Sequence, residues 1–226
     1  MKFNGNRWDQ IFQSEGRVFD NPHEDMPQLI PYFKAQGAKR ILDLGCGSGR
    51  HIVYLAKHDF EVYGIDASPV GIELAKRWME DEKLTASLII GSIYNKLPYA
   101  DACFDAVISV QVIHHNTAEN IRRMIAEIWR VLQPEGLFFA TIPMYKNQAK
   151  QFQQIEENTF LPLDGREKGI PHYYFDKERI RKFFSAFKIL DIHVDSKSHY
   201  CFLGEKSPVP PLRYEQMRLK KGGEST

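Results

Sequence analysis

Three closely spaced glycines follow the short apolar run ILDL, and this is the part of the chain whose spacing most favours ligand binding. Gly45, Gly47 and Gly49 stand immediately before a segment with helical spacing. Glycine has no side chain and tolerates positive φ, so a ligand can approach the backbone closely at such a turn. Open α/β sheets bind their ligands beyond the carboxyl ends of the strands. The turn therefore predicts a site for a nucleotide-like molecule.

A carboxylate ends the next apolar run, FEVYGID. Asp66 lies roughly 20 residues after the first glycine, where an acidic side chain accepts hydrogen bonds from ribose hydroxyls in such folds. The glycine spacing is G-C-G-S-G rather than G-x-G-x-x-G, and no Walker lysine follows. A phosphate-bearing ligand is disfavoured, and with it a nicotinamide-dependent dehydrogenase.

Residues suited to proton transfer follow another apolar run, in the segment SVQVIHHN. Gln111, His114 and His115 come directly after the fourth expected strand. We predict these three as catalytic residues, with His114 as the first candidate for acid-base chemistry. The alternative is that one histidine only begins a helix in a satisfied hydrogen bond. No carboxylate set for a magnesium site is evident, so no metal is predicted.

Aromatic and imidazole side chains recur toward the C-terminus, where they could wall a substrate pocket. Packing in the core or in a lid is the competing interpretation, as it is for Trp8, Phe12 and Phe19 near the N-terminus, which could close over a cofactor. Aromatic faces also attract cations. The predicted substrate residues are His172, Tyr173, Tyr174, His199 and Tyr200.

Strand-like and helical patterns alternate between residues 39 and 143, which predicts an α/β fold with a doubly wound, Rossmann-like sheet. Two further runs, FKILDIHVDS and HYCFLGEKS, form a plausible antiparallel pair. We therefore expect seven strands, mostly parallel, with an antiparallel C-terminal strand and an inserted lid. Ser68, Asn116 and Asp176 are the expected helix N-caps.

The length of 226 residues and the 43% hydrophobic content suit one domain spanning residues 1–206. Within it, the long polar and aromatic segment 144–175 is expected to be a lid or an insertion with short helices. The expected parts are an N-terminal cap at 1–38, a cofactor-binding core at 39–143, the lid at 144–175, a C-terminal helix and strands at 176–206, and a flexible tail at 207–226.

Composition limits the partners. The net charge of +1 provides no field that would concentrate a polyanion, so nucleic acid is not the expected partner. The N-terminal residues lack an apolar signal core, and no apolar run approaches the roughly 20 residues that cross a bilayer. The three cysteines are widely separated, without a CxxC pair. These features favour a cytoplasmic protein that acts on a small molecule; the oligomeric state is left open.

The motifs LDLGCGSGR and GIDAS together resemble the first two signature motifs of the class I S-adenosylmethionine-dependent methyltransferases, and the span 39–143 is similar to them in order. The segments GCGSGRH and YLAKHDFEVYGIDAS look most like the UbiE/COQ5-like enzymes and the methyltransferase type 11 or tellurite-resistance-like enzymes. The resemblance implies S-adenosyl-L-methionine as the cofactor.

Family roles transfer by position. The resemblance implies that Asp43 orients the amino-acid end of the cofactor through the turn, and that Asp66 holds the ribose. Relatives often have Gly-Asp after the third strand, but here Ser92 and Ile93 follow Gly91, so weaker polar recognition of adenine with retained packing is expected. The full predicted cofactor set is Asp43, Gly45, Cys46, Gly47, Gly49, Asp66, Ala67, Ser92, Ile93 and Gln111.

The function predicted from these observations is in-line transfer of a methyl group to an oxygen, sulfur, nitrogen or chalcogen nucleophile of a small molecule. A general base is optional, because thiolates and amines need little help while hydroxyl groups gain roughly 10²- to 10⁴-fold from one. Two alternatives stay open. One is a non-catalytic S-adenosylmethionine-binding partner subunit or regulator, and the other is an RNA or protein methyltransferase.

Overall fold

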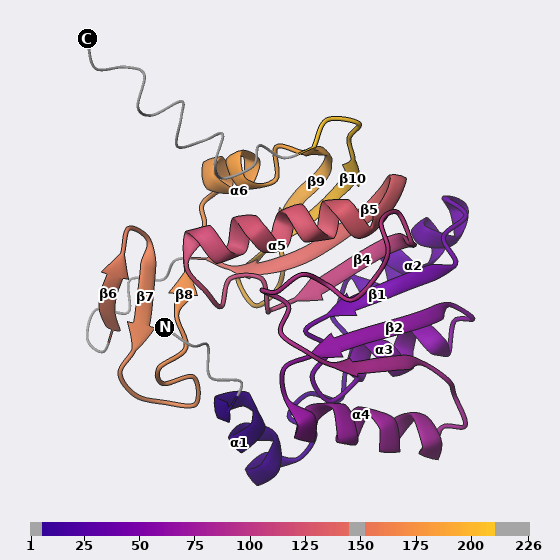
Figure 1. Cartoon of the computed structure of the whole chain (residues 1–226), viewed down its shortest axis with the longest axis horizontal. Coiled ribbons are helices and arrows are strands. Elements are labelled where there is room, and N and C mark those ends of the chain that lie inside the picture. The colour runs from indigo at the N-terminus through magenta and orange to yellow at the C-terminus, as the bar shows by residue number, and fades with distance from the viewer. Residues whose placement is uncertain (1–5, 145–151, 211–226) are drawn as a thin grey trace.

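The computed structural model describes residues 6–144 and 152–210, and its largest element is a seven-stranded sheet with the strand order β3-β2-β1-β4-β5-β10-β9 (Figure 1). Neighbouring strands are parallel from β3 to β5, and β10 is antiparallel to both β5 and β9. The predicted sheet and its antiparallel C-terminal pair are therefore confirmed. The strands are β1 (Arg40–Leu44), β2 (Glu61–Asp66), β3 (Ser87–Ile90), β4 (Phe104–Val110), β5 (Leu132–Pro143), β9 (Phe187–Val194) and β10 (His199–Lys206).

Helices cover both faces of this sheet, which explains why the strands are apolar without alternation. In β1, Ile41 packs in the cluster that contains α2, α3 and α4, while the adjacent Leu42 packs in the cluster that contains α5 and α6. Successive side chains of a strand point to opposite faces, so these two clusters lie on opposite sides of the sheet. The helices are α1 (Asn6–Glu15), α2 (Met26–Ala35), α3 (Arg50–Ala56), α4 (Pro69–Asp81), α5 (Ala118–Val131) and α6 (Lys177–Phe183).

Two of the three expected N-caps are confirmed. The Ser68 hydroxyl accepts a hydrogen bond from the backbone N–H of Gly71, and the Asp176 carboxylate accepts one from Arg179. The prediction for Asn116 was wrong, because α5 begins only at Ala118. The Ala118 N–H donates instead to Glu156 Oε1 at 2.7 Å. A residue distant in the chain thus caps α5, which local spacing could not indicate.

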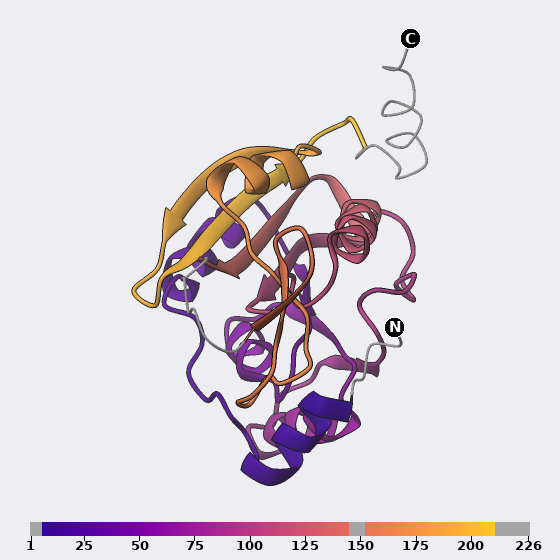
Figure 2. The ribbon, with the colours of Figure 1, turned by 90° about the vertical axis from the view of Figure 1, so that its left-hand side faces the viewer.

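The segment predicted as a lid forms a small antiparallel sheet of three strands rather than short helices. The strands are β6 (Phe152–Glu156), β7 (Thr159–Pro162) and β8 (His172–Tyr173), in that order. The loop between β7 and β8 contacts α1, since Arg7 donates to the carbonyl oxygens of Arg166 and Gly165 at 2.7 and 3.0 Å. In the two views, α1 and this loop lie on the same side of the molecule (Figures 1 and 2).

The lid role and the domain boundaries stay predictions. Residues 145–151 of the lid segment and 211–226 of the predicted flexible tail lie outside the described residues. Within the described part of the chain, no helix combines the length and apolar character needed to cross a membrane.

Candidate functional site

A cavity lies beyond the carboxyl ends of β1, β2 and β4, where the sequence predicted a ligand site. It brings together segments that are far apart in the chain, including α1, the glycine turn and the residues after β4. Of the predicted site residues, those that line it are Gly45, Cys46, Gly47, Asp66, Ala67, Ser92, Ile93, Gln111 and His115.

The glycine turn has two positions at the cavity that only glycine fits. The φ angles of Gly45 and Gly47 are 81° and 51°, which side chains rarely adopt. A Cβ on Gly45 would lie 2.5 Å from Cγ1 of Val112, and one on Gly47 would lie 3.1 Å from Phe12 Cζ. The turn thus presents backbone without side chains to the cavity.

Gly49 has a different role from the one predicted. It is the N-cap of α3 with φ 94°, and it is not among the residues lining the cavity. A Cβ there would lie 2.8 Å from the Cβ of Ala75 in α4. Gly49 therefore permits α3 and α4 to pack closely, and this packing holds the turn in place.

Asp66, at the end of β2, accepts two backbone hydrogen bonds. Its Oδ2 accepts from Gly47 N at 2.9 Å and its Oδ1 from Ser68 N at 2.8 Å. Burial raises the pKa of Asp66, and the hydrogen bonds from Ser68 and Gly47 oppose that shift. A carboxylate has about four lone-pair sites, so capacity remains for hydroxyl groups of a ligand in the cavity.

Asp43 is buried at the end of β1 and does not itself line the cavity. Its Oδ2 has no hydrogen-bond partner within the described residues, and the closest imidazole nitrogen, His51 Nδ1, is 3.9 Å away. Burial raises the pKa of Asp43 to about 7, although the Arg50 charge acts in the opposite direction. The carboxyl group thus gains a proton on folding near neutral pH.

Replacement of Asp43 by asparagine should remove a pH dependence of stability. The pKa of Asp43 is about 7 in the folded protein and about 3.9 in the unfolded chain. Between these two pH values the native state therefore retains a proton that the unfolded state has released. Stability of the wild type should therefore fall as pH rises from 4 to 7, by on the order of 4 kcal/mol at most. Urea unfolding without added ligand at pH 5, 6, 7 and 8 measures this, with exposed Asp81→Asn as the control. Equal slopes for wild type and Asp43→Asn would contradict it.

The residues predicted to contact adenine line one end of the cavity. Ser92 and Ile93 follow β3, and Ala67 follows β2. The Ser92 hydroxyl accepts from Tyr94 N at 3.3 Å, which leaves its own hydrogen available to donate. Ile93 and Ala67 provide apolar surface for a planar ring.

Gln111 is held in an uncommon backbone conformation at the end of β4. Its φ is 60°, although it carries a side chain, and its N–H donates to Thr141 Oγ1 at 2.9 Å. Such conformations persist where the surrounding structure imposes them and cluster at functional sites. The Gln111 side chain is thereby directed to the cavity wall, with its Nε2 at 3.4 Å from Nε2 of His199.

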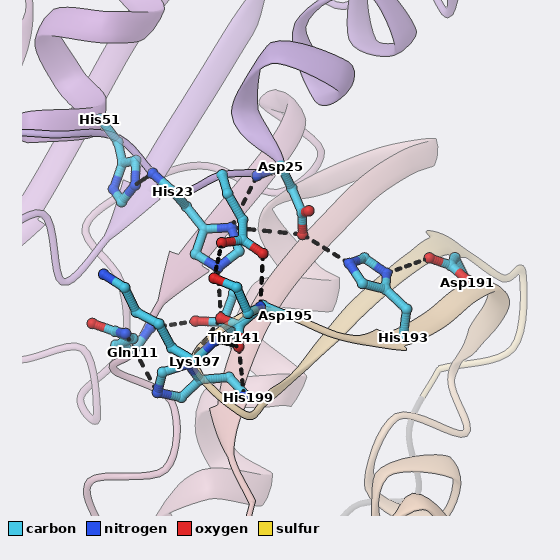
Figure 3. Close-up of polar contacts among 12 residues, drawn as sticks. His23, Asp25, His51, Gln111, Thr141, Asp191, His193, Asp195, Lys197 and His199 are labelled. Atoms are coloured by element: carbon cyan, nitrogen blue, oxygen red, sulfur yellow. Dashed lines mark hydrogen bonds and ion pairs between the residues drawn. The ribbon is translucent and has the colours of Figure 1, made fainter.

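Behind Gln111 lies a chain of buried polar groups (Figure 3). Nδ1 of His199 lies 2.8 Å from Asp195 Oδ2, and Nε2 of His23 lies 3.0 Å from the same oxygen. The backbone N–H of His23 then donates to Nε2 of His51 at 3.1 Å. His199 was predicted to contact substrate; it lies behind Gln111 and is positioned to orient its amide.

Three histidines lie together at one side of the cavity. His114 and His115 follow β4, and His172 belongs to β8, which is fixed to them by a hydrogen bond of 2.8 Å from Tyr173 N to the His114 carbonyl. Only His115 lines the cavity, together with Glu167. Burial lowers the pKa of His115 to about 3, assisted by the charge of His172, and burial likewise lowers that of His114. Both rings are neutral near pH 7, and His115 rather than His114 faces the cavity.

The other predicted substrate residues do not line this cavity. The Tyr173 ring packs against Phe175 and Phe183, at centroid distances of 4.6 and 5.1 Å. Tyr174 contacts Phe160, and Tyr200 packs against the core from β10. Residue type suited these rings to a pocket, but Tyr173 and Tyr200 pack against the core instead.

Several lining residues escaped the sequence-based set. Trp8, Phe12 and Phe19, for which packing was the competing interpretation, line the cavity, and so do Arg50 and His51. Ser48, Tyr94, Val110, Val112 and Glu167 were not considered and line it too. Glu167 lies in a polar loop without apolar periodicity, so no local signal marks it.

The central part of the chain is similar to known methyltransferases. A family model described as "Methyltransferase domain" matches residues 41–136. The chain is 24% identical over 206 residues to the tRNA N(3)-methylcytidine methyltransferase trm140 of Schizosaccharomyces pombe, covering 84% of this chain and 66% of that protein. It spans less than half the length of several other relatives that it matches.

Solved structures agree with this fold. A methyltransferase described as S-adenosylmethionine-dependent, from Methanosarcina mazei, superposes with a TM-score of 0.68 at 21% identity, covering 82% of this chain and 98% of that one. The 1,6-didemethyltoxoflavin-N1-methyltransferase of Burkholderia thailandensis, solved with 1,6-didemethyltoxoflavin and S-adenosylhomocysteine, superposes with a TM-score of 0.65 at 17% identity, covering 90% and 88%.

Proposed function

We propose that this chain is a class I S-adenosylmethionine-dependent methyltransferase that transfers the methyl group of S-adenosylmethionine to a small-molecule acceptor; the match of residues 41–136 to the methyltransferase-domain family supports this. One observation carries the proposal. A single cavity joins the glycine turn and Asp66 at one end to Gln111, His115 and Glu167 at the other. A cofactor and an acceptor can therefore meet in one cavity.

The residues at the first end of this cavity fit the cofactor. Asp66 retains acceptor capacity for ribose hydroxyls, and the bare backbone of Gly45 and Gly47 leaves space for the methionine portion. Ala67, Ser92 and Ile93 would contact the adenine. Asp43 does not line the cavity, so it would affect the cofactor only indirectly, by positioning the glycine turn.

The cofactor, when bound, supplies a methyl group on an electrophilic sulfonium. The chain's contribution is to orient the acceptor and exclude water, which can supply much of the rate enhancement of an in-line transfer. Gln111 and His115 would orient the acceptor through hydrogen bonds. Trp8 and Phe12 of α1 would close the cavity, as the aromatic pair lies over the turn with ring centroids 5.9 Å apart.

A small acceptor is supported by this closure and by charge. The net charge of +1 does not favour a polyanion. Arg7 holds α1 beside the cavity by donating to the carbonyl of Arg166. The three cysteines are free, which is consistent with action in the reducing cytoplasm. The proposal covers acceptors in which the methylated atom is a nucleophilic nitrogen, oxygen, sulfur or other chalcogen.

Calorimetric titration of the purified protein tests the proposal. S-adenosylmethionine and S-adenosylhomocysteine should each bind with one site, and NAD should not bind. An acceptor screen that begins with thiols, chalcogen oxyanions and small phenols would follow. Absence of binding by a folded, ligand-free protein would refute the proposal. Binding without turnover of any acceptor would favour a partner subunit or regulator.

An RNA acceptor is a second candidate, because the similarity to the S. pombe tRNA methyltransferase extends over 84% of this chain. Binding to RNA would depend on phosphate contacts and would weaken steeply with salt. Titration with bulk tRNA at low and at moderate salt distinguishes the two. Saturable binding and methylation of tRNA would replace the small-molecule proposal.

A further inference from the structure

Three buried imidazoles lie close together beside the cavity, and the Glu167 carboxylate contacts two of them. One ring nitrogen from each of His114, His115 and His172 falls within 4.8 Å of the other two. All three residues are at least 95% buried. They come from two separate segments, so packing of β8 against the end of β4 creates the cluster.

Two nitrogen atoms of this cluster are unpartnered. Nδ1 of His114 and Nε2 of His115 are buried and have no hydrogen-bond partner among the residues that the structure describes. Leaving a buried polar atom unsatisfied costs roughly 1–3 kcal/mol, so native structures usually provide a partner. A cation that binds imidazole nitrogen would satisfy both atoms.

Glu167 completes a set of four donors. Its Oε2 lies 2.9 Å from Nε2 of His172, and its Oε1 lies 3.6 Å from Nε2 of His115. Donors at about 2.0–2.1 Å from a tetrahedral zinc ion are about 3.3 Å apart. The two Glu167–histidine separations, 2.9 and 3.6 Å, lie on either side of that value. His172 Nδ1 lies 2.7 Å from the carbonyl of Ile170, the outer contact that orients a metal-binding imidazole.

We propose that His114, His115, His172 and Glu167 bind one divalent transition-metal ion, with Zn²⁺ as the fitting species. Imidazole ligands suit zinc, and one carboxylate lowers the charge of the site. The sequence analysis predicted no metal, because it found no carboxylate set for a magnesium site. His114 and His115 lie in a different segment from Glu167 and His172, and the two pairs meet only when β8 packs against the residues that follow β4.

The ion would face the acceptor end of the cavity, because His115 and Glu167 line it. An acceptor atom that displaced Glu167 from the metal would take over its coordination position at this end of the cavity. A thiolate or ionised hydroxyl group of the acceptor would then bind the metal. This role rests on the proposed methyl transfer, whereas metal binding itself does not.

Zinc binding is measured without cofactor or acceptor, so its outcome is independent of methyl transfer. The full chain is stripped with a chelator and titrated with Zn²⁺ in competition with a chromophoric chelator. We expect one equivalent per chain. Substitution by Co²⁺ should give the visible absorption of a tetrahedral site without a thiolate charge-transfer band, because no cysteine takes part.

Variants locate the ion. His172→Gln should abolish zinc binding, and Glu167→Gln should weaken it by at least roughly 10- to 100-fold, the range seen even for groups outside the ligand set. The Glu167 side chain is 37% exposed, so this variant should fold even if His172→Gln does not. His58→Gln is a matched control, since this half-buried histidine follows α3, contacts the carbonyl of Tyr54 and belongs to none of the candidate metal clusters among the described residues.

A second cluster, formed by His23, Asp195 and Cys201, could also bind zinc and is tested as the alternative site. His23→Gln should leave zinc affinity unchanged. Failure of the wild type to bind zinc stoichiometrically, unchanged affinity in Glu167→Gln, or loss of binding in His23→Gln would each overturn the proposal. If zinc binds as expected while S-adenosylmethionine does not, the metal site stands and the proposed function fails.

Discussion

Replacement of Asp66 by alanine should weaken binding of S-adenosylmethionine by roughly 5- to 150-fold, equivalent to about 1–3 kcal/mol. The substitution removes the acceptor proposed for the ribose hydroxyls. It also removes the acceptor for the N–H of Gly47, 2.9 Å away, which holds the glycine turn. Both losses act on the same ligand. Calorimetry on wild type and variant at one pH and salt concentration measures the change.

Two control variants separate these contributions. Asp81→Ala removes an exposed carboxylate from the end of α4 and should leave affinity unchanged. Asp66→Asn keeps one acceptor oxygen for the backbone but loses the charge, so it should fall between wild type and Asp66→Ala. If Asp66→Ala is folded, as judged by its unfolding curve, and binds like wild type, the ribose assignment is wrong.

Replacement of Gly49 by alanine should cost roughly 2–4 kcal/mol of unfolding free energy. About 1 kcal/mol arises from the left-handed backbone at φ 94°, which disfavours a side chain. About 1–3 kcal/mol arises from overpacking, because the new Cβ would lie 2.8 Å from Ala75 Cβ and 3.1 Å from its Cα. The clash involves backbone, so rotation of a side chain cannot relieve it. Urea unfolding at constant pH measures the loss.

Gly37→Ala is the matched control for backbone strain. Gly37 has φ 75°, but a Cβ there would meet nothing within 4 Å. Its cost should therefore be only about 1 kcal/mol, and the difference between the two variants isolates the packing of α3 on α4. Equal costs would show that α3 and α4 move apart freely. The folded Gly49→Ala protein should lose less cofactor affinity than Asp66→Ala, because Gly49 does not line the cavity.

The predicted site residues that line the cavity share a physical property: the sequence signal for each of them is local. Glycine at positive φ and an acid at the end of an apolar strand are defined by a few neighbouring residues. Parallel strands bring their carboxyl ends to one edge, so a pattern of alternating strands and helices already places Gly45, Asp66 and Gln111 together. The seven-stranded sheet was therefore predictable, and so was the position of the glycine turn and Asp66 at the cavity.

Residues near the acceptor end were predicted less well because their positions depend on contacts between distant segments. His114 and His115 are adjacent in the chain, yet only His115 faces the cavity. Tyr173 turns into the core because β8 pairs with β7, and that pairing leaves no distinctive local pattern. Residue type alone could not distinguish a wall of the cavity from a core contact.

The sequence by itself determined the sheet, the glycine turn and the carboxylate that ends β2, since each depends on periodicity or backbone geometry within a short segment. Only the tertiary structure decided that residues of α1 line the cavity, that Gly49 packs against Ala75, and that Glu167 lies beside His115 and His172. These contacts join residues separated by long stretches of chain. Their geometry is set by packing of whole elements, which a linear pattern does not encode.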